Sequence, residues 1–356
     1  MKKEVGSIFP LSDAALSKAE SEKKAFSNDR VFYSLCREAL YDLARSLDVD
    51  SRIVLIPAYT CQTVITPFEE TGWQCFFYSI NKDLRIVVQY LIKEVEIYHP
   101  SLIVVHPYYG MDLNQKEVEI LNSLNNKGIA IVLDLTQCLF TKNSYSFASF
   151  IVASYRKWVP IPDGGYLLST QSDLKNITQP ETENTDFTER EIAAMYLRGK
   201  YFECEEQRMK DVSIKLGKIA DRIVEKHLSP HRMSQVSYNI LSEEDLEENQ
   251  RRRIANYSYL FHRIHDGESI TKVCKELDSV TTAPLYFTIY VKNRVCLQRQ
   301  LASDAIYAPI LWPVEDERVL INDEVKYIYD HLLAIPCDQR YNEKDMQRAV
   351  EIINCF

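Results

Sequence analysis

The residues best suited to chemistry follow two short apolar runs between positions 129 and 168. The first run ends on Asp134, with Gln137 three positions later, and the second ends on Ser154, with Lys157 just beyond. Short apolar runs bounded by polar residues predict buried strands, each carrying its last polar side chain at its carboxyl end. Ligands of open α/β sheets bind at that edge, so we expect these four side chains to line one site.

Together the four side chains suit pyridoxal phosphate. A lysine can form a Schiff base with a carbonyl cofactor, and an aspartate can keep a pyridine nitrogen protonated so that the ring withdraws electrons. Gln137 would donate to a ring oxygen and Ser154 to the phosphate, with Lys157 as anchor and proton shuttle. Each residue alone is more often structural, so the hypothesis depends on the joint spacing of D-x-x-Q, S-x-R-K and P-x-P-D-G-G.

These motifs and five further segments occur in an order that resembles the fold-type I pyridoxal phosphate enzymes, and most of all the DegT/StrS-type sugar aminotransferases. The further segments are SLCREAL (34–40), IPAYTC (56–61), VVHPYYG (104–110), HRMS (231–234) and LLAIPCDQRY (332–341). The resemblance implies an α/β fold with a large, mostly parallel-sheet domain covered by helices and a smaller C-terminal α+β domain. We expect these domains at residues 1–228, which include an N-terminal arm, and at residues 229–356.

The resemblance also implies an activity and a set of site residues. The enzyme would move an amino group from an amino-acid donor, with glutamate expected, to a nucleotide-linked keto-sugar for polysaccharide biosynthesis. It would work as a homodimer, because the family builds each active site at the dimer interface. Lys157 and Asp134 would be catalytic, and the cofactor would be held by Cys36, Arg37, Cys61, Asp134, Gln137, Ser154 and Lys157.

Two positions depart from the family pattern. Cys61 stands where an aromatic residue commonly stacks on the cofactor ring, which leaves Tyr59, Tyr108 and the sulfur of Cys61 as open alternatives. Pro230 stands where an asparagine usually reaches the cofactor phosphate of the neighbouring subunit. The compact S-x-R-K spacing and the D-x-x-Q motif are also similar to those of cysteine desulfurases.

A helical pattern that begins near Ser34 predicts a phosphate site at the start of a helix. Ser34 fits an N-cap, and Cys36 and Arg37 would then lie in the first turn, where backbone amides and the helix dipole favour an anion. The chain has only nine glycines and only Gly164 and Gly165 are adjacent, which excludes the G-x-G-x-x-G and G-x-x-x-x-G-K loops. Strands alternate with helical segments over residues 52–134, which predicts βαβ units and a parallel sheet.

Composition narrows the class of protein. The formal net charge of -9 argues against a nucleic-acid-binding face. No apolar run reaches the roughly 18 residues of a membrane helix, and the N-terminus has no apolar core of a signal peptide, so we expect a cytoplasmic protein without a membrane contact. The nine cysteines never form C-x-x-C and are expected to be reduced thiols. No histidine or cysteine spacing predicts a metal site.

Two alternative functions stay open from the sequence alone. A pyridoxal phosphate lyase or desulfurase would use the same cofactor residues, but a desulfurase also needs a mobile cysteine, and Cys138 beside Gln137 lacks a Gly/Ser-rich loop. A non-catalytic relative would keep the fold and bind a sugar nucleotide. His106, at the end of another expected strand, could line the site, although a near-core histidine is the commoner case.

Overall fold

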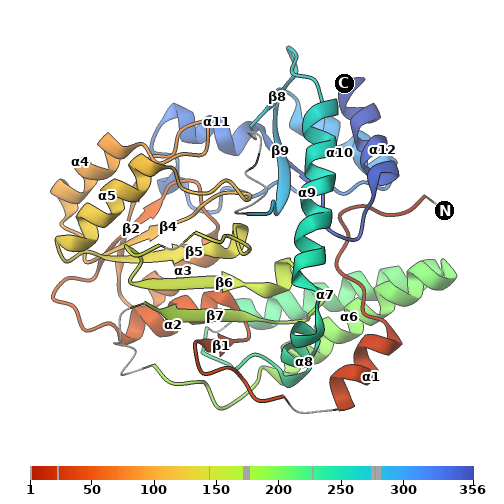
Figure 1. Cartoon of the computed structure of the whole chain (residues 1–356), viewed down its shortest axis with the longest axis horizontal. Coiled ribbons are helices and arrows are strands. Elements are labelled where there is room, and N and C mark those ends of the chain that lie inside the picture. Colours follow the sequence, from red (N-terminus) through yellow and green to blue (C-terminus); the bar gives the residue numbers. More distant parts are fainter. Residues whose placement is uncertain are drawn as a thin grey trace. The chain divides into compact units, whose positions relative to one another are not determined.

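The computed structural model describes residues 2–21, 24–143, 145–170, 177–226, 228–273, 277 and 282–356 (Figure 1). They form a seven-stranded sheet of order β1-β7-β6-β5-β4-β2-β3 and a three-stranded sheet of order β10-β9-β8. The residues group into two compact units. We call Ile8–Asp48 with Phe150–Glu244 the first unit, and Lys2–Ser7, Val49–Ser149 and Asp245–Phe356 the second unit. The expected domain boundary between residues 228 and 229 stays a prediction.

The second unit contributes four parallel strands to the large sheet, and these confirm the βαβ pattern. They are β2 (Ile53–Pro57), β3 (Gln74–Tyr78), β4 (Leu102–Val105) and β5 (Ala130–Asp134). Strands β4 and β5 are apolar along most of their length because both faces of a parallel sheet are covered. The connecting helices are α3 (Gln62–Glu70), α4 (Val88–Tyr98) and α5 (Gln115–Asn126), of which α5 begins with a capping box from Asn114 and Glu117.

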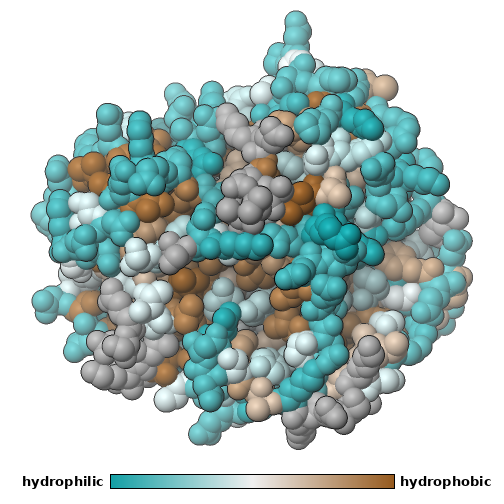
Figure 2. Space-filling model, in the orientation of Figure 1, coloured by the Kyte–Doolittle hydropathy of each residue, from teal (hydrophilic) through white to brown (hydrophobic). Residues whose placement is uncertain are grey.

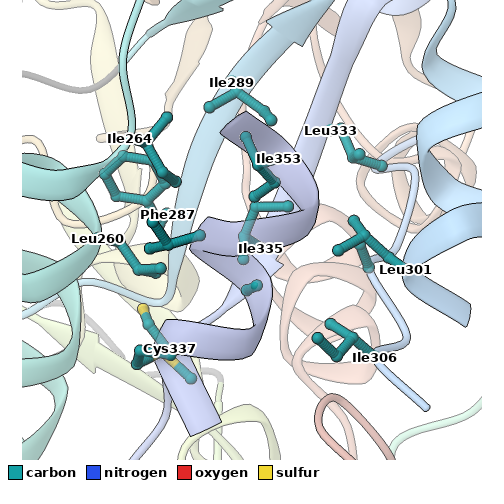
Figure 3. Packing of buried hydrophobic residues seen from close by; sticks show 14 of the residues in the cluster. Leu260, Ile264, Phe287, Ile289, Leu301, Ile306, Leu333, Ile335, Cys337 and Ile353 are labelled. Carbon is teal, nitrogen blue, oxygen red and sulfur yellow. The ribbon is translucent and has the colours of Figure 1, made fainter. Parts of the chain in front are cut away.

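The second unit also contains the small antiparallel sheet and its core. The strands β8 (Ile270–Lys272), β9 (Tyr286–Val291) and β10 (Leu332–Pro336) pair antiparallel. Helices α9 (Leu246–Arg263), α10 (Arg294–Ser303), α11 (Asp323–His331) and α12 (Glu343–Asn354) accompany this sheet. Figure 3 shows Phe287 and Ile335 of the sheet packed among Leu260, Leu301 and Ile353 of the helices.

The first unit holds the antiparallel end of the large sheet. Strand β6 (Phe150–Ser154) pairs with β7 (Gly165–Ser169), and β7 pairs with β1 (Val31–Tyr33). Its helices are α1 (Asp13–Ser21), α2 (Cys36–Ser46), α6 (Thr185–Cys204), α7 (Gln207–Lys226) and α8 (Gln235–Glu243). Helix α6 ends at Cys204 and is separate from α7, because Glu205 adopts a left-handed conformation with φ of 56°.

A mostly parallel sheet of seven strands, helices on the strand connections and a small antiparallel sheet confirm the predicted α/β fold class. The helices α6 and α7 pack against each other along their length (Figure 1). Among the described helices, none is long and apolar enough to cross a membrane.

The core of the small sheet supplies a test of the packing. Ile335 is fully buried, so Ile335→Ala removes apolar contacts and leaves a cavity. We expect the free energy of unfolding to fall by about 2–5 kcal/mol, measured by urea denaturation. Ile97→Ala is the matched control, because Ile97 is 53% exposed and its truncation should change stability by no more than about 0.5 kcal/mol. Equal effects of the two changes would contradict this description of the core.

Candidate functional site

Asp134 ends strand β5 as predicted, and its buried carboxylate contacts a backbone N–H and a histidine ring. Oδ1 accepts a hydrogen bond of 2.8 Å from the backbone N–H of Thr136, in the 3-10 turn η1 (Leu135–Gln137). Oδ2 lies 3.4 Å from Nδ1 of His106, which directly follows β4. Burial of a carboxylate is costly without polar partners, so the contact with His106 and the hydrogen bond from the turn hold the acid in place.

A third strand joins this arrangement through a threonine. Nε2 of His106 lies 2.8 Å from Oγ1 of Thr60, which follows the end of β2. Thr60, His106 and Asp134 therefore form a continuous polar chain across the carboxyl ends of β2, β4 and β5. The sequence interpretation of His106 as a near-core histidine missed this link, although its place at a strand end was the available signal.

Gln137 lies at the end of turn η1, and the oxygen of its side-chain amide is hydrogen-bonded within the protein. Its Oε1 accepts a hydrogen bond of 3.1 Å from the backbone N–H of Tyr109, so the amide orientation is fixed. Within the part of the chain that the structure describes, this leaves the two N–H donors of Nε2 for another acceptor. A buried amide with fixed donors beside a buried carboxylate suits a ring that presents both an oxygen and a protonated nitrogen.

The three alternatives for a stacking residue differ in what surface they present. Tyr59 and Tyr108 are 0% and 1% exposed, and burial raises the pKa of both phenols well above the usual value of 10. The ring of Tyr59 packs against Trp312 and Tyr329, with centroid distances of 5.1 Å for each. Cys61, at the cap position of α3, is only partly buried. Of the three side chains, Cys61 is therefore the most exposed.

Ser154 and Lys157 belong to the first unit and flank one turn. Ser154 ends β6 opposite Gly165, and Lys157 ends the 3-10 turn η2 (Tyr155–Lys157). The turn is held by a hydrogen bond of 2.8 Å from the N–H of Tyr155 to the carbonyl of Gly164. Ser154 is buried and Lys157 is exposed, and neither side chain has a hydrogen-bond partner among the described residues. Both groups are thus available to a ligand.

The predicted N-cap at Ser34 is wrong, because the chain around Ser34 is bound to two distant segments. Its N–H donates to the carbonyl of His231 at 2.8 Å, and its carbonyl accepts from Gly164 at 2.6 Å. Leu35 takes the cap position instead, so α2 begins at Cys36 without a side-chain cap. An uncapped first turn containing Cys36 and Arg37 retains the character expected of an anion site.

Gly165 brings strand β7 against this first turn. A Cβ atom at Gly165 would lie 2.5 Å from the backbone nitrogen of Cys36, which is closer than real Cβ contacts allow. The second glycine of the D-G-G motif therefore permits the approach of β7 to α2. In this way the first unit holds Cys36, Arg37, Ser154 and Lys157, while the second unit holds Cys61, Asp134 and Gln137.

Buried acids connect α2 with the turns on either side. Glu38 is 3% exposed and accepts from the N–H of His231 at 3.1 Å, while its other oxygen lies 3.1 Å from Nδ1 of the same residue. Asp163 accepts from the N–H and the hydroxyl of Ser234 at 2.9 and 2.7 Å, and also from the hydroxyl of Ser237. The segments that contain the D-G-G and HRMS motifs are therefore joined through Asp163 and Ser234, and HRMS is joined to α2 through Glu38.

Burial and hydrogen bonding shift the pKa values of the ionisable groups in this network. Burial raises the pKa of Glu38 above its usual 4.5 and the pKa of Asp163 above its usual 3.8, against the lowering effect of their hydrogen bonds. The hydrogen bond with Glu38 raises the pKa of His231 above its usual 6.5. Among the described residues, the buried hydroxyl of Ser34 has no hydrogen-bond partner.

The described residues also show where the metal-ligating side chains and the cysteines lie. No group of three or more histidine, cysteine, aspartate or glutamate side chains is placed there to hold a metal ion. Eight of the nine cysteines are free thiols, and Cys274 lies outside the described residues. Cys138 is fully buried, and burial raises the pKa of its thiol to about 12.

The similarity of this chain to known proteins lies in its fold. No family model and no curated protein matches the sequence. The fold is that of the fold-type I aminotransferases, and many solved structures share it. PseC of Helicobacter pylori, an aminotransferase involved in the biosynthesis of pseudoaminic acid, is 14% identical with a TM-score of 0.69, and the alignment covers 99% of this chain and 98% of that chain.

Two other solved structures are similar to the same extent. The putative sugar aminotransferase Spr1654 of Streptococcus pneumoniae, in its PLP form, is 13% identical with a TM-score of 0.70, and the alignment covers 100% of this chain and 98% of that chain. DesI, determined in the presence of its TDP-sugar product, is 12% identical with a TM-score of 0.65, over 98% of this chain and 86% of that chain.

The pair formed by Glu38 and His231 predicts a pH dependence of stability. Both groups bind protons more tightly in the folded chain, so the free energy of unfolding falls as the pH rises through their pKa values. We expect His231→Gln to lose most stability, relative to the wild type, below the usual histidine pKa of 6.5, and less as the pH rises beyond it. Urea unfolding midpoints at a series of pH values measure this difference.

His262→Gln is the control for the same substitution, since His262 is exposed on α9. Its difference from the wild type should be small. A His231→Gln difference that stays constant across the pH range would show that the Glu38 contact does not titrate with folding.

Proposed function

We propose that this chain is a pyridoxal phosphate-dependent aminotransferase that acts on a nucleotide-linked keto-sugar, with glutamate as the expected amino donor. The observation that carries the proposal is the buried Asp134 carboxylate beside the donors of Gln137, at the end of β5 in a fold shared with solved sugar aminotransferases. Cytoplasmic location and a role in polysaccharide biosynthesis belong to the same proposal.

The residues present fit the cofactor. An uncapped α2 with Gly165 against its first turn suits a phosphate, with Cys36, Arg37 and Ser154 as the surrounding residues. Asp134 suits a protonated ring nitrogen, Gln137 a ring oxygen and Cys61 the ring face. Spr1654, a similar structure, is known in PLP and PMP forms, which supports the choice of cofactor.

Pyridoxal phosphate supplies an electron sink to which an amino group can be attached and from which it can be passed on. Lys157 would hold the cofactor covalently, move to release it to an amino donor, and carry a proton between the donor carbon and the cofactor carbon. Asp134 would keep the ring nitrogen protonated. His106 and Thr60 would hold Asp134 in the orientation that this requires.

The sugar acceptor rests on similarity to other proteins. The DesI structure was determined in the presence of its TDP-sugar product, which supports a nucleotide-linked sugar as the acceptor class. A desulfurase is the rival with the same cofactor residues, but it needs a mobile, reactive thiol. Cys138 follows Gln137 in the sequence, but it is fully buried, its sulfur lies 3.2 Å from the hydroxyl of Thr282, and burial raises the pKa of its thiol. This cysteine is therefore unsuited to that role.

We also propose that two chains associate through helix α7. Ser213 and Ala220 are fully buried in the first unit, and the Ser213 hydroxyl donates to the carbonyl of Ala194 on α6 at 2.7 Å. Larger apolar residues recur every three or four positions along α7, namely Met209, Val212, Leu216, Ile219 and Ile223. Val212 and Ile219 are 36% and 42% exposed, so a second copy of this helix would cover apolar surface on both chains.

The cofactor assignment predicts a lysine-dependent spectrum. Purified protein given pyridoxal phosphate should show a visible absorption band that Lys157→Ala lacks, and the wild-type band should change when glutamate is added. Lys127→Ala is the control, because Lys127 is exposed at the end of α5. Loss of the lysine should lower the rate of amino transfer by at least about 100-fold.

Three other results of these experiments would contradict parts of the proposal. A band that depends on Lys157 but ignores every amino donor would favour another pyridoxal phosphate reaction or a non-catalytic relative. A band of equal strength in both lysine variants would refute the cofactor site. Full activity of Asp134→Ala would refute the role of the carboxylate.

The proposed dimer predicts a change of mass. The molar mass of the wild type, measured by light scattering after size-exclusion chromatography, should be twice the chain mass of 41.4 kDa. Ile219→Glu should lower this mass toward that of a single chain. Lys218→Gln changes the charge of α7 by the same amount at an exposed position outside the apolar stripe and should stay dimeric. An Ile219→Glu protein that remains dimeric would place the interface elsewhere.

A further inference from the structure

A groove of about 680 Å³ in the second unit runs along strand β3, which is the last strand of the large sheet. Four consecutive residues of that strand line it, Gln74 to Phe77. Consecutive residues of a strand point to opposite faces of a sheet, so a groove that touches all of them follows the open backbone edge. The groove involves none of the residues assigned above to the cofactor.

The hydrogen bonds of β3 show which backbone groups face the groove. The N–H of Gln74 donates to the carbonyl of Arg52 at 2.7 Å, and the carbonyl of Tyr78 accepts from Ala58 at 2.9 Å, so even-numbered residues of β3 bond to β2. Cys75 and Phe77 therefore direct their N–H and carbonyl groups away from β2. Such an edge can accept another strand.

The groove has a wall on each side of this edge. Tyr90, Glu94 and Tyr98 of α4 form one wall, and the ring of Tyr98 stacks on Phe76 with a centroid distance of 3.8 Å. Trp73, Arg318 and Ile321 belong to the other wall, with the Arg318 guanidinium 5.9 Å from the centre of the Phe77 ring. The edge is thus recessed between two walls, which excludes the equally recessed β3 of a second copy and admits a single extended segment.

Charge and exposure indicate what kind of segment fits. Arg318 is already bound to Glu69 and Asp316, whereas Glu94 has no partner among the described residues. Tyr90 and Ile321, one from each wall, are 44% and 40% exposed. Figure 2 shows further hydrophobic residues gathered on the surface over α4 and α5. An incoming strand would therefore need a basic residue opposite Glu94 and apolar residues for the walls.

We propose that this groove binds an extended segment of a partner protein as an added strand of the large sheet. Backbone groups of the segment pair with Cys75 and Phe77, which supplies affinity, and its alternate side chains contact the two walls, which supplies specificity. A lysine or arginine of the segment lies opposite Glu94.

A display library of short random peptides, selected on the full-length protein loaded with pyridoxal phosphate, tests the proposal. Peptides that alternate apolar residues and contain a lysine or arginine should be enriched on the wild type and lost on Cys75→Pro. Proline is tolerated on an edge strand where its missing N–H faced outward, and its ring blocks pairing. If Cys75→Pro lowers the unfolding midpoint, Tyr90→Ala provides the same comparison from the wall. A failure to enrich any peptide on the wild type over these variants would overturn the proposal.

An enriched peptide then tests the charge. Its dissociation constant, measured by fluorescence anisotropy, should rise about tenfold on Glu94→Lys and recover when the basic residue of the peptide is replaced by glutamate. Glu96→Lys is the matched control, because Glu96 is exposed on the same helix and does not line the groove. Equal losses from both variants would overturn the contact with Glu94, and amino transfer should be unchanged in either.

Discussion

A carboxylate buried at the end of a strand imposes the main constraint on the second unit. Asp134 is 6% exposed, so the cost of removing it from water must be offset by donors that approach from its neighbours. The polar groups around it come from the next turn and from His106, which follows β4, and His106 is in turn held by Thr60, which follows β2. Only parallel strands bring three carboxyl ends to one edge, so the chemistry of this acid depends on the topology of the sheet.

The first unit meets a corresponding requirement by close backbone approach. A glycine lets β7 reach the first turn of α2, and backbone hydrogen bonds from Ser34 reach both Gly164 and His231. The buried Glu38 and Asp163 then join the same segments through side chains. Positions that are more than 100 residues apart in the sequence are thereby fixed relative to one another within this unit.

Local sequence patterns predicted the strands and their last residues, because an apolar run and the polar residue that ends it are adjacent in the chain. Asp134 and Ser154 were placed at strand ends in this way. Contacts between distant segments could not be predicted by that route. Serine is a common N-cap residue, but the backbone of Ser34 is hydrogen-bonded to Gly164 and His231 instead. The contact between His106 and Asp134 likewise forms only when β4 and β5 pair. The turn at Glu205 could not be predicted from the sequence either, because the left-handed residue there is not a glycine.

The hairpin of α6 and α7 has a consequence for the order of folding. Its two helices are joined by a turn of two residues, so the loop that must close to bring them together is very short. Strand β1 can pair with β7 only after Val31 meets Leu167, which requires closure of a far longer loop. Local contacts form faster than distant ones, so the hairpin should acquire protection from hydrogen exchange before β1 joins the sheet.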